Sequence, residues 1–187
     1  GHYYHDDRGR RVLDFLAQYG AVPFGHNPPA VWDAIRAHGD AVHACMVQPL
    51  MAPQAEALAA RLIALAPGKM RYATFVNSGA EANEGAIKLA RRWGRKLKGG
   101  AYEIITFVRA FHGRTLATLS ATGSRKVQAG FEPLVSGFVR ARFGDLEELA
   151  SIGRNNHSIV AVLVEPIQGE SGVRVAPEGY LEGLRAL

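Results

Sequence analysis

Cysteine is nearly absent from this sequence: Cys45 is the single thiol among 187 residues. One thiol cannot form a disulfide within the chain, so a disulfide-based framework is excluded and a reducing compartment is indicated. No apolar run reaches the roughly 20 residues of a membrane-spanning helix, and no secretory signal is visible. We therefore predict a cytoplasmic protein with no membrane partner.

The sequence also lacks a segregated basic region. Lysine and arginine outnumber aspartate and glutamate 22 to 17, which gives a net charge of +5, but these residues are scattered. The densest group, residues 91–98, falls where a helix is predicted to end, and cations there complement the helix dipole. We predict no nucleic-acid partner, although a basic nucleic-acid module stays open as an alternative. A small anionic ligand fits the charge equally well.

Metal-ligand spacing and the common hydrolase signature are missing as well. The seven histidines are dispersed along the chain, and no GxSxG nucleophile turn is present. We therefore predict no metal site and no serine-hydrolase chemistry.

The first part of the chain contains local signals for a hairpin and two helices. Asp7-Arg8-Gly9 predicts the turn of a hairpin. Asn27 before Pro28-Pro29 predicts the start of an amphipathic helix that extends to about His38, and a second helix is predicted from Pro53. We place a boundary near residues 48–53 and predict two parts, residues 1–50 and 51–187.

From residue 71 onwards, strand and helix patterns alternate. Strands are predicted at residues 71–76, 102–108, 136–143 and 158–165, and helices at about residues 80–97, 115–121 and 146–152. The run Ile159–Val164 has no polar alternation, as expected for a strand that is covered on both faces. Alternating strands and helices with short loops predict the α/β class with a mostly parallel sheet.

Three loops that follow predicted strands have the sequences NSGAEANE, RAFHGRT and EPIQGESG. Right-handed crossovers bring such loops to one edge of a parallel sheet, where ligands bind. In the first loop, a capping box is predicted: Ser78 Oγ accepts the Glu81 amide, and the Glu81 carboxylate accepts the Ser78 amide. Helix stability alone explains this pattern, but Gly79 and Ala80 also leave first-turn amides open to a phosphate. The helix that follows has a predicted apolar stripe of Ala82, Ala86, Leu89, Ala90, Trp93 and Leu97.

The second and third loops admit two interpretations. Phe111, His112 and Arg114 can be a core residue, a satisfied hydrogen-bonding residue and a solvated charge. They can equally form a flat surface for a heteroaromatic ring beside a guanidinium that binds a carboxylate. Glu165 ends the last strand and Glu170 follows it, and a carboxylate near an arginine is often structural. Both interpretations stay open on these residues alone.

The segments NSGAEANEGAIKLAR, AFHGRTLATLSATG, GFEPLVSGF and VEPIQGESGV resemble the class III (ω-amino) aminotransferases, which depend on pyridoxal 5′-phosphate. Acetylornithine and ornithine aminotransferases are among the similar members, and the resemblance covers nearly the whole chain. It implies fold-type I, with residues 51–187 in the large cofactor-binding domain and residues 1–50 in the small domain and dimer contacts. It also implies a homodimer that moves an amino group from an ω-amino donor to a 2-oxo acid such as 2-oxoglutarate.

The same resemblance assigns roles to individual positions. The positions that it assigns to the cofactor are Ser78, Gly79, Ala80, Phe111, His112 and Glu165, with the phosphate at residues 78–80 and the ring against the phenylalanine. The positions that it assigns to the substrate are Tyr19, Arg114 and Glu170. Arg114 would bind the substrate carboxylate, and Glu170 would act as a gate that pairs with a distant arginine.

The family's Schiff-base lysine, and the aspartate at the ring nitrogen, have no counterpart here. None of the five lysines stands in the family's lysine motif: Lys69, Lys88, Lys96, Lys98 and Lys126. Because transamination needs a lysine as imine partner and as base, we expect residues 1–187 to be the N-terminal half of the enzyme and to be inactive alone. An inactive fragment with a structural or dimerisation role, an aminomutase, a decarboxylase and a racemase stay open as alternatives.

Overall fold

The computed structural model describes residues 1–39 and 52–187, which form two compact units, Gly1–Thr74 and Phe75–Leu187. The boundary predicted near residues 48–53 falls largely outside the described residues, as does Cys45. The division into residues 1–50 and 51–187 therefore stays a prediction. Within the described ranges, no helix combines the length and the apolar character that crossing a membrane requires.

The first unit contains one hairpin and three helices within its described residues. These elements are β1 (Tyr3–His5), β2 (Arg11–Leu13), α1 (Ala17–Gly20), α2 (Pro29–Gly39) and α3 (Pro53–Leu65). The Asp6 carboxylate accepts the Arg8 and Arg10 amides, and Gly9 has a φ of 73°, so the predicted turn closes the hairpin. Helices α2 and α3 both begin at a proline. The first residue of a helix has no helical acceptor for an amide hydrogen, so the hydrogen that proline lacks is not needed there. The predicted hairpin and both predicted helices are confirmed.

The second unit is built on a parallel sheet with the strand order β4-β3-β5. Its strands are β3 (Glu103–Phe107), β4 (Phe138–Ala141) and β5 (Ile159–Val162). Three of the four predicted strands are thereby confirmed. The strand predicted at residues 71–76 is wrong, because these residues form no strand in the structure. A strand needs a neighbour for its backbone amides and carbonyls, and no described segment pairs with this one.

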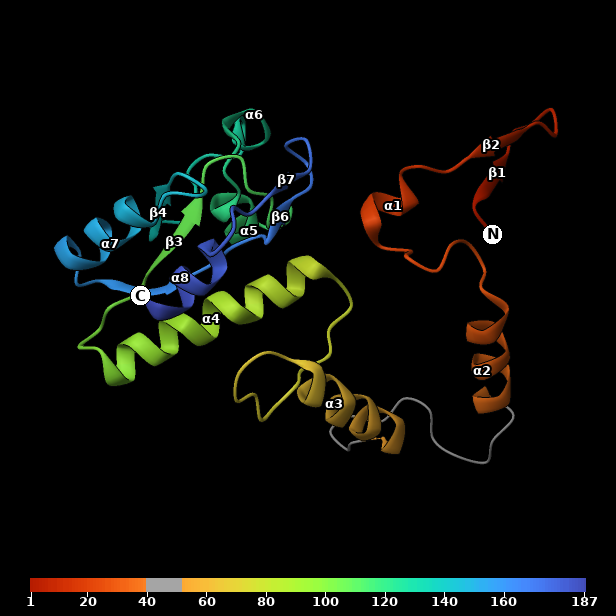
Figure 1. Ribbon diagram of the computed structural model, residues 1–187, viewed down its shortest axis with the longest axis horizontal. Helices are drawn as coiled ribbons and strands as arrows, with labels where there is room; N and C mark the ends of the chain where they lie inside the picture. The colour runs from red at the N-terminus through yellow and green to blue at the C-terminus, as the bar shows by residue number, and fades with distance from the viewer. Residues whose placement is uncertain (40–51) are drawn as a thin grey trace. The chain divides into compact units, whose positions relative to one another are not determined.

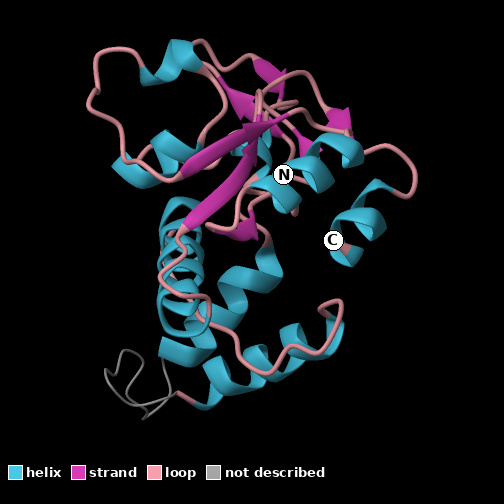
Figure 2. Ribbon diagram, turned by 90° about the vertical axis from the view of Figure 1, so that its left-hand side faces the viewer, coloured by secondary structure: helices cyan, strands magenta, loops and turns pink. Residues whose placement is uncertain are grey.

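Helices cover both faces of this sheet, as Figures 1 and 2 show. Because side chains alternate along a strand, Ile104 faces one side and Ile105 and Phe107 face the other. Helices α4 (Gly79–Leu97) and α5 (Leu116–Ala121) pack on the Ile104 side. Helices α7 (Leu146–Asn155) and α8 (Tyr180–Ala186) pack on the opposite side. The short helix α6 (Arg125–Gln128) and the hairpin of β6 (Ile167–Gln168) and β7 (Arg174–Val175) complete the unit and confirm the α/β class.

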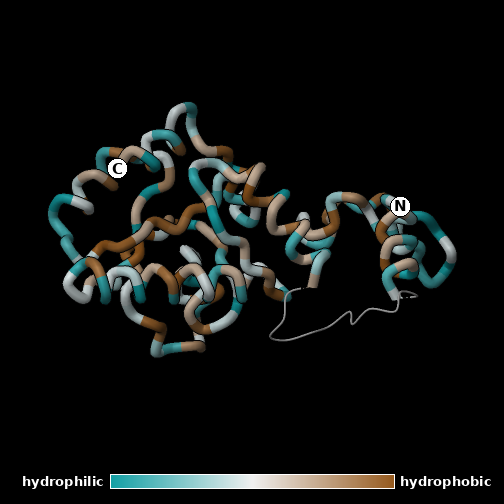
Figure 3. Tube along the Cα trace, turned by 90° about the horizontal axis from the view of Figure 1, so that it is seen from below, coloured by the Kyte–Doolittle hydropathy of each residue, from teal (hydrophilic) through white to brown (hydrophobic). Residues whose placement is uncertain are grey.

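Helix α4 is amphipathic, but its buried face is not the predicted one. The residues of this helix that are buried are Ile87 and Gly94. The predicted stripe lies mostly outside: Leu89 is 69% exposed and Leu97 is 73% exposed. A Cβ at Gly94 would lie 2.1 Å from the Ala101 carbonyl oxygen, so the glycine lets this face approach the chain before β3. Figure 3 shows hydrophilic and hydrophobic residues alternating along the helices.

Candidate functional site

Ser78 caps the first turn of α4. Its Oγ accepts a hydrogen bond from the Glu81 amide at 3.2 Å, as the capping box predicts. The reciprocal half of that prediction is wrong, because the Glu81 carboxylate accepts the Asn77 amide at 2.6 Å instead of the Ser78 amide. The same carboxylate also accepts the Asn77 side-chain amide at 3.1 Å, which favours this earlier partner.

The Gly79 and Ala80 amides are open donors at this end of the helix. First-turn amides have no partner within a helix, and no described residue accepts a hydrogen bond from either of these two. A Cβ placed on Gly79 would meet no atom within 4 Å. Among the described residues of the second unit, nothing therefore crowds Gly79 at the positive end of the helix dipole.

The second loop packs directly against the start of α4. The Asn83 side-chain amide donates to the His112 carbonyl oxygen at 2.7 Å. Gly113 has a φ of 135°, and a Cβ there would lie 2.9 Å from Ala80 Cβ, so only glycine fits between the loop and the helix. These contacts fix the FHGR segment beside the open amides.

The third loop is joined to the second by the Glu165 carboxylate. Glu165 Oε2 accepts the Phe111 amide at 2.7 Å. Burial raises the pKa of Glu165, and this hydrogen bond partly opposes the rise. Gln168 is 1% exposed; its side-chain amide donates to the Val108 carbonyl at 3.1 Å, and its oxygen accepts from the Ser171 hydroxyl at 3.4 Å. The three loops therefore meet at one edge of the sheet, as the sequence predicts.

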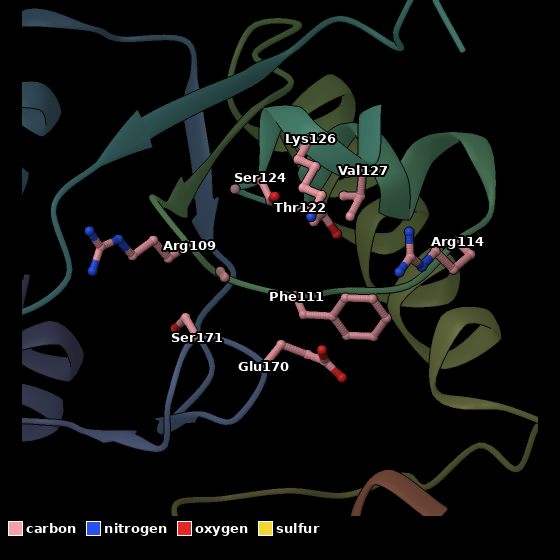
Figure 4. A pocket seen from close by; sticks show the side chains of 11 residues that line it. Arg109, Phe111, Arg114, Thr122, Ser124, Lys126, Val127, Glu170 and Ser171 are labelled. Carbon is pink, nitrogen blue, oxygen red and sulfur yellow. The ribbon is translucent and has the colours of Figure 1, made fainter. Parts of the chain in front are cut away.

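A cavity of about 400 Å³ opens beside Phe111. Phe111, Arg114 and Glu170 all line it, and Arg114 Cζ lies 5.5 Å from the centroid of the Phe111 ring. Figure 4 shows the aromatic ring between the guanidinium and the carboxylate. This arrangement suits a planar ligand that carries a carboxylate.

A family model described as Aminotransferase class-III matches residues 1–187. The chain belongs to the class-III aminotransferase family. Proteins of this family depend on pyridoxal 5′-phosphate, and the solved relatives share the fold-type I architecture with its parallel sheet. The resemblance stated from the four sequence segments, the fold class and the cofactor are therefore confirmed.

The class-III relatives include several acetylornithine aminotransferases. The chain is 45% identical over 183 residues to acetylornithine aminotransferase from Nitrosomonas europaea, covering 97% of this chain and 46% of that protein. It is 41% identical over 187 residues to acetylornithine aminotransferase 2 from Bordetella parapertussis, covering 100% of this chain and 46% of that protein. The chain thus spans about half the length of the curated relatives that it matches.

Solved structures give the same family. The ornithine aminotransferase from Toxoplasma gondii superposes with a TM-score of 0.88 at 26% identity, covering 100% of this chain and 44% of that one. A thermostable (S)-enantioselective omega-transaminase from Thermomicrobium roseum superposes with a TM-score of 0.87 at 34% identity, covering 100% and 46%. The ω-amino subgroup is therefore represented among both the sequence and the structural relatives.

Three of the nine predicted site residues, Phe111, Arg114 and Glu170, line the cavity. The other six do not: Ser78, Gly79, Ala80, Glu165, His112 and Tyr19. His112 is 4% exposed, and its Nε2 has no hydrogen-bond partner among the described residues. Burial and, to a smaller extent, the Arg140 charge together lower the pKa of His112 to about 4, so the ring is neutral at pH 7. Tyr19 belongs to the first unit and is 77% exposed. The cofactor role of His112 and the substrate role of Tyr19 stay predictions.

Residues that were not singled out from the sequence also line the cavity of this member of the class-III family. They include Thr122, Ser124 and Lys126, which follow helix α5. One sequence feature could have indicated these residues: they directly follow the predicted helix that begins after the FHGR segment. Asn83 was missed as well, because a polar side chain within a helix gives no sign of the distant carbonyl that it reaches.

Proposed function

We propose that this chain provides the phosphate and substrate-carboxylate sites of an aminotransferase. The enzyme would move an amino group from an ω-amino donor of the acetylornithine or ornithine type to a 2-oxo acid. The observation that supports this most is the bond between the Glu165 carboxylate and the Phe111 amide. It fixes an aromatic ring at the cavity wall, beside a helix whose first amides are open.

The residues present fit a phosphorylated pyridine. Gly79 has open space where a side chain would stand, and its amide and that of Ala80 are free to donate to phosphate oxygens, with the Ser78 hydroxyl beside them. Phe111 is half-buried and offers a flat face for the ring. Pyridoxal 5′-phosphate supplies an aldehyde that takes the amino group and a ring that withdraws electrons from the reacting carbon.

The substrate side of the proposal rests on two charged residues at the cavity. Arg114 presents a planar guanidinium that binds a carboxylate through two parallel hydrogen bonds. Glu170 is exposed at the opposite side of the ring, where it can attract an amino donor or pair with a cation. Glu165 acts through Phe111, whose backbone it holds in place.

We further propose that the base that moves the proton is a lysine outside residues 1–187. None of the five lysines matches the family's lysine motif, and Lys126, the one that lines the cavity, follows α5 rather than a strand. A homodimeric assembly, a cytoplasmic location and the inactivity of residues 1–187 alone stay predictions that rest on the family.

The test uses the full-length protein with pyridoxal 5′-phosphate, N-acetylornithine and 2-oxoglutarate, with glutamate formation as the readout. We expect turnover, and we expect Arg114→Met to lower kcat/KM by about 10- to 100-fold, because a charge-assisted hydrogen bond contributes about 1.5–3 kcal/mol. The matched control is Arg92→Met, which removes an exposed guanidinium from α4 away from the cavity. Turnover that is absent in the wild type, or equal losses in both variants, would refute the proposal.

A further inference from the structure

Arg114, the proposed carboxylate-binding residue, is not held in place by bonds of its own side chain. It is exposed, and its guanidinium forms no ion pair and no hydrogen bond within the described part of the chain. Figure 4 shows this guanidinium beside the Phe111 ring. A guanidinium that binds a carboxylate through two parallel hydrogen bonds must meet it at one angle. The backbone of Arg114 must therefore be positioned by the residues on either side of it.

Two consecutive residues of α4 hold the chain on the two sides of Arg114. On one side, the Asn83 side-chain amide donates to the His112 carbonyl oxygen at 2.7 Å. On the other side, the Thr115 hydroxyl donates to Glu84 Oε1 at 2.5 Å. Both anchors lie about one helical turn after the open first-turn amides of the same helix. One helix therefore sets the position of the guanidinium relative to the proposed phosphate site.

Thr115 departs from the usual behaviour of a threonine at its position. It directly precedes α5, where a threonine oxygen commonly accepts a first-turn amide, yet it forms no such bond. Because a carboxylate only accepts hydrogen bonds, the Thr115 hydroxyl gives its one hydrogen to Glu84. The Thr118 hydroxyl, which is 0% exposed and 2.8 Å from the Thr115 oxygen, then donates to that oxygen. Such a departure from a local preference is typical of a functional site.

We propose that Glu84 is a positioning residue: through Thr115, it fixes the angle at which Arg114 meets a substrate carboxylate. This proposal rests on the proposed aminotransferase function and adds a residue to its carboxylate site. The charge of Glu84 alone predicts the opposite effect, because a negative charge beside the FHGR segment repels an anionic substrate. Removal of Glu84 should weaken carboxylate binding if this residue positions Arg114, and should strengthen it if only its charge matters.

The first experiment measures kcat/KM for N-acetylornithine with the full-length enzyme. In Glu84→Ala, we expect a fall of about 3- to 10-fold, mostly through KM, because one charge-assisted hydrogen bond is lost. Glu84→Gln keeps an oxygen for the Thr115 hydroxyl and should restore most of the value. Thr115→Val should reproduce the loss, and Thr115→Ser should not. Glu147→Ala is the matched control, because it removes an exposed carboxylate from α7, on the opposite face of the sheet.

A double-mutant cycle distinguishes positioning from a general structural role. In the Arg114→Met background, Glu84→Ala should cause little further loss of kcat/KM, because the guanidinium that it positions is gone. A loss of the same size in both backgrounds would overturn the proposal. A rise in kcat/KM in Glu84→Ala would overturn it as well, in favour of charge repulsion.

A second measurement separates this proposal from the proposed function, because it needs no turnover. Pentanoate is titrated calorimetrically into the full-length protein, and its affinity should fall about 3- to 10-fold in Glu84→Ala but stay near the wild-type value in Glu84→Gln. If this pattern is found without transamination, the function fails and the positioning role stands. If transamination occurs but Glu84→Ala matches Glu147→Ala in kcat/KM and in pentanoate affinity, the positioning role alone is overturned. A wild type that binds no pentanoate would overturn both.

Discussion

The two compact units of the chain differ in how their secondary structure is held. No described residue before Phe75 is buried, although this unit forms a hairpin and three helices. The second unit contains every buried hydrophobic residue of the described chain, on both faces of its sheet. The elements of the first unit carry local signals, such as the turn carboxylate of Asp6 and a proline at the start of α2 and α3. The second unit depends on long-range packing, and it is there that the cavity lies.

The largest test of this difference replaces one phenylalanine in each unit of the 187-residue chain. Phe107 is 0% exposed and packs its ring against Phe143 and Tyr180. We expect Phe107→Ala to lower the free energy of unfolding by about 3–5 kcal/mol. Phe15 is 92% exposed, so Phe15→Ala should change it by less than about 0.5 kcal/mol. Urea unfolding followed by fluorescence measures both, and similar losses would contradict the contrast between the units.

The second prediction concerns how acid changes the stability contributed by one residue in each unit. Burial lowers the pKa of His112 from 6.5 to about 4, so the folded state favours the neutral ring. The neutral ring therefore contributes to the free energy of unfolding above pH 6.5. As the pH falls from 6.5 towards 4, the unfolded chain binds the proton first and this contribution, roughly 3 kcal/mol, is lost. In the first unit, the hydrogen bond from the Ala17 amide lowers the pKa of Asp14 from 3.8 to about 2, so its contribution is lost only between those values.

The measurement is the free energy of unfolding from urea titrations at intervals between pH 7 and 3. We expect His112→Gln to flatten the profile between pH 6.5 and 4, and Asp14→Asn to leave that interval as it is in the wild type. A wild-type slope that persists in His112→Gln would exclude this histidine as its source.

Two glycines of α4 allow a packed and an open position to be compared within a single helix. At Gly94, a Cβ would lie 2.1 Å from the Ala101 carbonyl oxygen and 2.4 Å from Val160 Cγ1. Gly94→Ala should therefore reduce the free energy of unfolding by about 1–3 kcal/mol. A Cβ at Gly85 would meet no atom within 4 Å, so Gly85→Ala should raise the free energy of unfolding by about 0.5–1 kcal/mol. Thermal unfolding of both variants checks the opposite signs, and equal shifts would argue against the close approach at Gly94.

The smallest effects concern the first residues of two helices, one in each unit. Ser78→Ala removes the side-chain cap of α4 and should destabilise by about 1 kcal/mol. Helix α3 follows Ala52, which has an extended backbone and no side-chain cap. Ala52→Ser should add up to about 1 kcal/mol. Hydrogen exchange of the first turn of each helix reports the two changes separately; protection that moves in the same direction in both helices would be inconsistent with capping.

Elements with a strong local pattern were predictable, and those that depend on a partner were not. Helix α4 and the strands of the sheet follow from periodicity and composition, which are properties of neighbouring residues. Residues 71–76 have the same β-branched and aromatic character, yet they form no strand because nothing in the described chain pairs with them. The prediction of the buried face of α4 was also wrong, because that face is the one on which Gly94 lets the chain before β3 approach closely.

The meeting of the three loops was predictable from chain topology, because parallel strands deliver their carboxyl ends to one edge. The position of Lys126 was not, since a four-residue helix has no periodic signal and is fixed by the hydrogen bonds of Gln128. The hydrogen bond from the Asn77 amide to Glu81 was equally unpredictable, because sequence spacing does not distinguish the Asn77 amide from the Ser78 amide that follows it. Prediction thus failed where a single side chain chooses between neighbouring partners.

The buried amide of Gln168 has a consequence for substitutions in the turn that it holds. It joins the end of β3 to the turn between β6 and β7, so the turn keeps its place whatever side chain stands at position 170. Glu170 is exposed in that turn, and its side chain forms no hydrogen bond or ion pair with any described residue. A substitution at position 170 should therefore change the charge at the cavity while the hydrogen bonds of Gln168 still hold the turn.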